Sequence, residues 1–181
     1  MIIVHDVALS QPVDYRRWAL TLPFQTLTIA GELWQGIAIT RDDTLPACVR
    51  RILPHAQPGL TFFRRSPRGQ SEPNFIHSDE TMGQWTAILY MNLNPEDGDG
   101  TTFWRHRASG ALRGDASEIW RRDRDHSAWE PWRHVRAQFN RLLVFDAPLF
   151  HSRGIEENYG EGEDARLIQV VFGRYGNGEE R

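Results

Sequence analysis

The sequence predicts a mainly β fold with flanking helices, of the double-stranded β-helix class (jelly roll, cupin-like). Two observations support this prediction. Short runs rich in β-branched and aromatic residues, separated by turn residues, recur through the second half of the chain. At 181 residues and 40% hydrophobic composition, the chain also has the size of one domain with one core, so residues 1–181 are expected to form a single unit.

Residues 1–73 are expected to form an N-terminal buttress beside the barrel. Runs of β-branched and aromatic residues predict strands, and apolar residues at helical spacing predict helices. The predicted strands are 2–7, 33–39 and 60–64, and the predicted helices are 14–19 and 45–55. A helix laid on the outside of a sheet would cover apolar surface that otherwise stays wet.

Residues 74–174 are expected to form the jelly-roll core. Its strand candidates are 84–92, 101–105, 141–150 and 166–172. In the last candidate, alternation places Arg166 on the same face as Ile168 and Phe172. A charge at the head of an apolar, inward face needs a partner.

Two histidines and one aspartate are the candidate metal ligands. His77 and Asp79 are one residue apart in a segment expected to be extended, where residues i and i+2 point to the same face. His151 directly follows the apolar run 141–150, so it closes a buried strand and can meet the pair across a barrel. Two imidazoles and one carboxylate make the facial triad that holds Fe(II) and leaves coordination positions open.

Five features follow one another along the second half of the chain. They are the His-x-Asp pair, a strand ending in Tyr90-Met-Asn92, the turn Gly98-Asp-Gly-Thr-Thr-Phe103, the strand before His151, and a strand that begins at Arg166. This ordered set resembles the 2-oxoglutarate/Fe(II)-dependent dioxygenase superfamily, and within it the prolyl-4-hydroxylase-like branch. The order is more specific than any single motif, and the resemblance covers roughly residues 74–174.

The resemblance implies Fe(II) as cofactor and 2-oxoglutarate as co-substrate. It makes His77, Asp79 and His151 the metal ligands and catalytic residues, and it requires a cation for the far carboxylate of 2-oxoglutarate. Because all 21 basic residues are arginine, an arginine must serve, and its planar fork suits a carboxylate. Arg166 is the expected anchor and Arg153 the alternative. The connection from His151 to Arg166 is longer than is usual in the family, and its acidic run 156–164 resembles an inserted loop.

Tyr90 and Thr101 match positions that often contact the co-substrate in this family. Alternation puts Tyr90 on the same strand face as Thr86 and Ile88, so a phenol facing a polar pocket is one interpretation. The other is a core tyrosine whose hydroxyl bonds to the backbone. Gly98 and Gly100 are expected to serve a tight turn rather than a phosphate site.

The segment 106–138 interrupts the core and is a possible lid insertion. It contains Trp120, Trp129 and Trp132, with seven arginines between Arg107 and Arg136. Tryptophan and arginine near a pocket favour planar, anionic or peptide substrates. The alternative is a solvated surface whose arginines pair with neighbouring acids, as in 121–124.

The bulk properties indicate a cytoplasmic protein. A formal net charge of −3 argues against nonspecific binding to nucleic acid or to an anionic membrane. A single cysteine, Cys48, excludes an intrachain disulfide and a cysteine zinc cluster. No signal peptide is recognisable, and no apolar run is long enough to span a bilayer.

The predicted function is an Fe(II)- and 2-oxoglutarate-dependent dioxygenase that hydroxylates a small molecule or a peptidyl side chain. Such an enzyme would use O2 as oxidant and would release succinate and CO2. The alternative is a cupin-type metal-binding module, or a metal enzyme that does not use 2-oxoglutarate. The sequence leaves the primary substrate and the oligomeric state open. For each of the three ligands the plainer alternative is a structural side chain.

Overall fold

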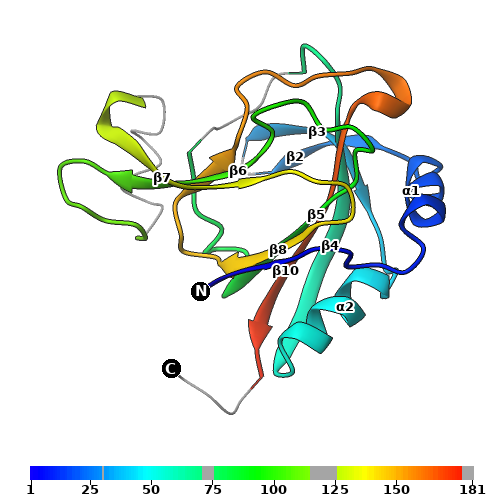
Figure 1. Cartoon of the computed structure of the whole chain (residues 1–181), viewed down its shortest axis with the longest axis horizontal. Coiled ribbons are helices and arrows are strands. Elements are labelled where there is room, and N and C mark those ends of the chain that lie inside the picture. The colour runs from blue at the N-terminus through cyan, green and yellow to red at the C-terminus, as the bar shows by residue number, and fades with distance from the viewer. Residues whose placement is uncertain (30, 71–75, 115–125, 177–181) are drawn as a thin grey trace.

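Two antiparallel sheets form the body of the protein (Figure 1). The computed structural model describes residues 1–29, 31–70, 76–114 and 126–176. Within these residues the large sheet has seven strands, in the spatial order β1-β8-β5-β10-β4-β3-β2. Their bounds are β1 Ile2–His5, β2 Gln25–Ile29, β3 Glu32–Ile39, β4 Ala56–Ser66, β5 Trp85–Tyr90, β8 Leu142–Asp146 and β10 Arg166–Tyr175.

The small sheet has the order β7-β6-β9 among the described residues. Its strands are β6 Gly100–His106, β7 Trp129–Arg136 and β9 His151–Arg153. β6 pairs with β9 so that Phe103 lies opposite His151 and Thr101 opposite Arg153. Directly opposite residues in an antiparallel pair share a face, so these four side chains all point to one side.

The inner strands of the large sheet are buried on both faces. Along β10, Ile168, Val170 and Phe172 pack in an interior cluster with residues of the small sheet, whereas Leu167 and Val171 pack in a second cluster on the other face. This alternation follows from the two-residue period of a strand. It confirms that Arg166 heads the inward face of β10.

Two helices cover the outer face of the large sheet. α1 (Pro12–Leu20) starts with a proline, whose fixed φ and missing N–H suit a first turn. α2 (Thr44–Ile52) buries Leu45, Cys48 and Val49 on one side and carries Arg50 and Arg51 in its last turn. Figure 1 shows both helices on the side of the large sheet away from β6 and β7. Short 3-10 helices span His126–Ala128 and Gly162–Asp164.

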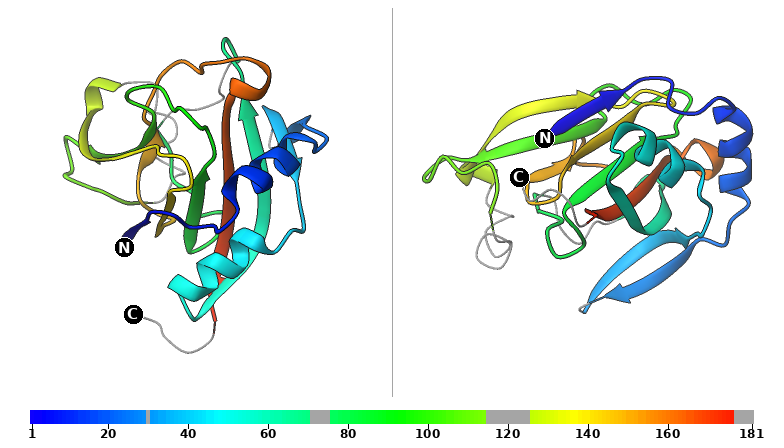
Figure 2. Two further views of the ribbon diagram at one scale, coloured as in Figure 1. Left: turned by 45° about the vertical axis from the view of Figure 1, so that its right-hand side comes forward. Right: turned by 90° about the horizontal axis from the view of Figure 1, so that it is seen from below.

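The first 73 residues do more than buttress the barrel. The expected strands and helices of this region are all present, and the structure adds β2, which the sequence analysis missed. β4 pairs with β10 and β1 pairs with β8, so these strands are part of the main sheet itself. Figure 2 shows the β2–β3 hairpin projecting from one edge of that sheet.

The possible lid at 106–138 is partly a regular hairpin. Its residues 129–136 form β7, which pairs with β6 along most of its length. Trp120 and the run 121–124 lie outside the described residues. A lid function for this segment stays a prediction.

Candidate active site

His77 and His151 are held together by the backbone. The His77 N–H donates to the His151 carbonyl at 2.9 Å, and the His151 N–H donates to the His77 carbonyl at 2.8 Å. The two residues thus form an isolated antiparallel bridge between segments far apart in the sequence. Their imidazole rings lie 4.4 Å apart. The bridge places both rings on the same side of the barrel wall.

The three predicted ligands converge on one point. His77 Nε2 lies 3.7 Å from Asp79 Oδ1, and His151 Nε2 lies 3.3 Å from Asp79 Oδ2. One ligand atom from each residue lies within 4.8 Å of the others. Among the described residues this is the one group of three or more His, Cys, Asp or Glu side chains close enough to hold a metal ion.

Hydrogen bonds fix the orientation of two of these side chains. Nδ1 of His151 lies 2.9 Å from the Leu149 carbonyl, which can accept only from an Nδ1–H. In the neutral imidazole this bond leaves the lone pair on Nε2, the nitrogen that faces Asp79. Thr86 Oγ1 donates to Asp79 Oδ2 at 2.8 Å. The rings of Phe103 and Phe145 pack around the His151 ring. Such partners preorganise metal ligands.

The protonation of the triad follows from the contacts between its members. Burial would raise the pKa of Asp79, but His151, His77 and Thr86 together hold it below its usual value. Burial would lower the pKa of His151, but Asp79 and the Leu149 carbonyl raise it above its usual value. The carboxylate is therefore ionised, as a metal ligand must be.

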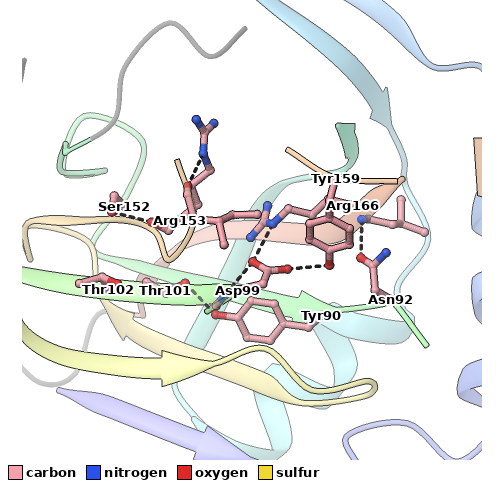
Figure 3. A network of polar contacts seen from close by, with 12 residues as sticks. Tyr90, Asn92, Asp99, Thr101, Thr102, Ser152, Arg153, Tyr159 and Arg166 are labelled. Carbon is pink, nitrogen blue, oxygen red and sulfur yellow. Dashed lines mark hydrogen bonds and ion pairs between the residues drawn. The ribbon is translucent and has the colours of Figure 1, made fainter. Parts of the chain in front are cut away.

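Arg166 lies in the same barrel, at the inward face of β10. Only 6% of its surface is exposed. Its Nε donates to Asp99 Oδ1 at 2.9 Å, and Tyr159 donates from its hydroxyl to Asp99 Oδ2 at 2.8 Å (Figure 3). Within the described part of the chain Arg166 makes no other side-chain hydrogen bond, so the N–H groups on its terminal nitrogens have no protein acceptor.

Tyr90 and Thr101 are in contact with each other. Their hydroxyl oxygens are 2.7 Å apart, and both residues are almost fully buried. Tyr90 packs in the interior cluster with Ile88 and Ile168. The alternative of a hydroxyl bonded to the backbone is not what the structure shows, since its partner is a threonine side chain on the facing sheet.

Arg153 and Arg64 add positive charge to this end of the interior. Arg153 donates from Nε to the Ile155 carbonyl at 2.8 Å, so it is partly committed to its own loop. Arg64 lies opposite Ile168 in the β4–β10 pair, on the inward face. Burial and the nearby charge of Arg166 lower the pKa of Arg64 to about 10. Burial, Arg166 and Arg64 likewise lower that of Arg153 to about 10.

Three residues of this region were not recognised in the sequence. Thr86 could have been found, because it shares a strand face with Tyr90. Asp99 lies between two glycines that were taken only as a turn. Tyr159 lies in the acidic run 156–164 and carries no local signal, because its role depends on packing between distant segments.

Two other side chains of types that bind metals, those of His106 and Asp146, lie away from the triad. The ring of His106 packs on Trp129 and its Nδ1 lies 2.9 Å from Ser109 Oγ, away from the triad. Asp146 pairs with the N-terminal amine and with Arg113. Asp146 therefore takes part in ion pairs away from the triad.

The fold is similar to that of solved non-heme iron enzymes. Over 94% of this chain and 76% of the other, it matches SnoN, the non-heme alpha ketoglutarate dependent epimerase from nogalamycin biosynthesis, with a TM-score of 0.59 at 13% identity. It matches the carbocyclase SnoK from the same biosynthesis with a TM-score of 0.58 at 11% identity, over 99% and 83% of the two chains. It also matches iron-bound HygX from Streptomyces hygroscopicus with a TM-score of 0.55 at 12% identity, over 94% and 80%.

These likenesses confirm the predicted jelly-roll fold class. No family model matches the chain, and no curated protein matches it. Placement in the prolyl-4-hydroxylase-like branch stays a prediction. Of the helices in the described residues, none is both long and apolar enough to cross a membrane.

Proposed function

We propose that the protein is an Fe(II)- and 2-oxoglutarate-dependent dioxygenase. One observation carries the proposal: the barrel interior holds both a His-Asp-His triad and a buried arginine whose terminal nitrogens have no acceptor among the described residues. Either feature by itself, a His-Asp-His cluster or a buried arginine, could serve only the stability of the fold. The pair together matches the two ends of a chelating diacid.

The triad residues fit iron. His77 and His151 offer imidazole nitrogens and Asp79 a carboxylate oxygen, a donor set that suits Fe(II) and leaves positions for other ligands. With 2-oxoglutarate and O2, bound iron would supply oxidation of a substrate, with release of succinate and CO2. Thr86 and the Leu149 carbonyl would keep the ligands oriented whether or not the metal is present.

The anchor residues fit the far carboxylate of 2-oxoglutarate. A buried guanidinium with unused donors on two nitrogens is a bidentate site for a carboxylate. Thr86 beside the triad and Tyr90 beside the anchor lie on the same face of β5, four residues apart. That separation is about 13 Å along a strand, which a five-carbon diacid and its bonds at both ends can span. Tyr90 and Thr101 would contribute hydroxyl groups to the same carboxylate.

The proposed substrate is a small molecule. HygX has been solved with nickel, 2-oxoglutarate and hygromycin B, and SnoN with Fe3+, alpha ketoglutarate and nogalamycin RO. Because the similar folds include an epimerase and a carbocyclase, the fold alone permits oxidations other than hydroxylation. Hydroxylation is the outcome that we propose. Asp79 argues against halogenation alone, because halogenases of the family that the sequence resembles replace this carboxylate to admit chloride.

The test is co-substrate turnover. Purified protein with Fe(II), 2-oxoglutarate and O2 should release succinate slowly without a substrate and faster with one, and Asp79→Ala should abolish both rates. Asp146→Ala, at a carboxylate outside the barrel, is the matched control and should retain turnover. Tight metal binding without succinate release, over a broad panel of small molecules, would contradict the proposal and favour a cupin-type metal module.

A further inference from the structure

Asp99 is a buried carboxylate, and both of its oxygens accept hydrogen bonds from neighbouring groups. It is 1% exposed. Its Oδ1 accepts from Arg166 Nε at 2.9 Å and from the Gly100 N–H at 2.6 Å, while its Oδ2 accepts from the Tyr159 hydroxyl at 2.8 Å. Figure 3 shows the carboxylate between the guanidinium and the phenol. The residue is thus fixed from three sides.

The turn before β6 is built to deliver this side chain. Gly98 has φ +86° and Gly100 has φ +147°, backbone conformations that L side chains rarely adopt. A Cβ on Gly100 would also lie 2.1 Å from the Val135 carbonyl oxygen. The Asp99 carbonyl accepts from the Ala137 N–H at 2.8 Å, and this bond joins the turn to the C-terminal end of β7. The two glycines therefore bring the Asp99 backbone close to the barrel.

Asp99 engages Arg166 through one nitrogen only. A bond to Nε fixes the plane of the guanidinium and leaves the two terminal nitrogens for another carboxylate. We infer that Asp99 is the positioning residue that aims Arg166 at the far carboxylate of 2-oxoglutarate and thereby sets the length of diacid that fits. This inference rests on the proposed function.

Tyr159 connects Asp99 to the loop before β10. Tyr159 is 4% exposed and Asn158 is 3% exposed, although both lie in the acidic run 156–164. Asn158 donates to the Gln70 carbonyl at 3.0 Å, and the Gly160 carbonyl accepts from the Arg68 N–H at 2.8 Å. The loop is therefore fastened across the anchor end of the barrel. Its phenol braces Asp99 from the side opposite Arg166.

Electrostatics and positioning predict opposite effects of changing Asp99. A carboxylate beside the anchor repels an incoming carboxylate, so removing its charge alone should not weaken binding of a dianion. Asp99→Asn keeps an oxygen to accept from Arg166 Nε and the Gly100 N–H, and its amide can donate to the Tyr159 oxygen. Asp99→Ala removes the charge and every one of these bonds. The two variants therefore separate charge from position.

The experiment is equilibrium binding, without turnover, to the Fe(II) protein under anaerobic conditions. Calorimetry would measure the Kd of 2-oxoglutarate, of the shorter diacid oxaloacetate and of the longer diacid 2-oxoadipate. Asp99→Ala should raise the Kd for 2-oxoglutarate about 10- to 100-fold. It should also bring the Kd values of the three diacids closer together, so that the preference for 2-oxoglutarate becomes smaller. Asp99→Asn should stay within about threefold of wild type. Asp6→Asn removes the ion pair between Arg141 Nε and Asp6 Oδ1, outside the barrel. It should change neither the Kd for 2-oxoglutarate nor the preference among the three diacids.

The outcomes separate this inference from the proposed function. If wild type binds no 2-oxoglutarate, the proposed function fails. If wild type binds it and folded, iron-binding Asp99→Ala binds it equally well with the same length preference, the inference is wrong. Loss of binding in Asp99→Asn as great as in Asp99→Ala would also overturn it, because the charge would then be what matters. If Asp99→Ala does not fold, Tyr159→Phe decides: an unchanged Kd and length preference would overturn the inference.

Discussion

His77 and His151 exchange both of their backbone hydrogen bonds across an isolated bridge. The side chains of two directly paired residues point to the same side, so the backbone alone brings the two imidazoles together. Asp79 then reaches both rings, because its backbone N–H donates to the Ala147 carbonyl at 2.8 Å. The triad is thus assembled by main-chain bonds before any metal binds.

Because the bridge uses only main-chain atoms, His77→Ala should leave the fold intact and remove one ligand. We expect the Kd for Fe(II), measured anaerobically, to rise at least about 100-fold, with little change in thermal stability of the metal-free protein. His5→Ala, at an exposed histidine on β1, is the control and should bind iron as wild type does. Unchanged iron affinity in His77→Ala would show that His77 is not a metal ligand.

Thr86→Val should weaken metal binding without removing a ligand. The two side chains have nearly the same shape, but valine cannot donate to Asp79 Oδ2. We expect about a tenfold loss of Fe(II) affinity and a cost of about 1 kcal/mol in the free energy of unfolding. Thr102→Val is the matched control, because Thr102 contacts His134 instead. Equal iron affinities in the two variants would show that Thr86 has no such role.

The choice between Arg166 and Arg153 as anchor can be made by binding. Removing Arg166 alone would leave Asp99 buried without its counter-charge, so the double variant Arg166→Met/Asp99→Asn is preferable. It should lose at least about 100-fold in 2-oxoglutarate affinity, with Asp99→Asn as its matched control. Arg153→Ala should stay within about tenfold of wild type, since that guanidinium already bonds to its own loop. The reverse order of effects would make Arg153 the anchor.

Cys48 should be inert in the folded protein. It is 1% exposed, its Sγ lies 3.4 Å from the Ala8 carbonyl, and burial raises the pKa of its thiol. The thiolate is the reactive form, so alkylation should require unfolding. Mass spectrometry after iodoacetamide treatment should find no label on native protein and one label in denaturant. Rapid labelling of native protein would contradict the packing of α2 on the sheet.

Short-range patterns predicted the ligands and most strands. His77 and Asp79 need only a locally extended chain, and His151 follows an apolar run that any sheet would bury. The inward face of β10 follows from its two-residue period, so the position of Arg166 was predictable too. What local patterns miss is pairing across long separations.

Asp99 and Tyr159 illustrate that limit. Nothing near Asp99 in the sequence indicates that it meets Arg166, 67 residues further on. Tyr159 lies among acidic residues typical of an exposed loop, yet its hydroxyl is buried against Asp99. The pairing of β4 with β10 was missed for the same reason, because strand order depends on the whole sheet.

The central claim is that the triad and Arg166 together hold iron and 2-oxoglutarate. The most direct measurement is an anaerobic titration of the purified protein with Fe(II) and then 2-oxoglutarate, followed by visible absorbance. A charge-transfer band that appears only with both additions, and that is lost in Arg166→Met/Asp99→Asn while Fe(II) still binds, is the predicted result. Bound iron with no band at saturating 2-oxoglutarate would contradict the claim.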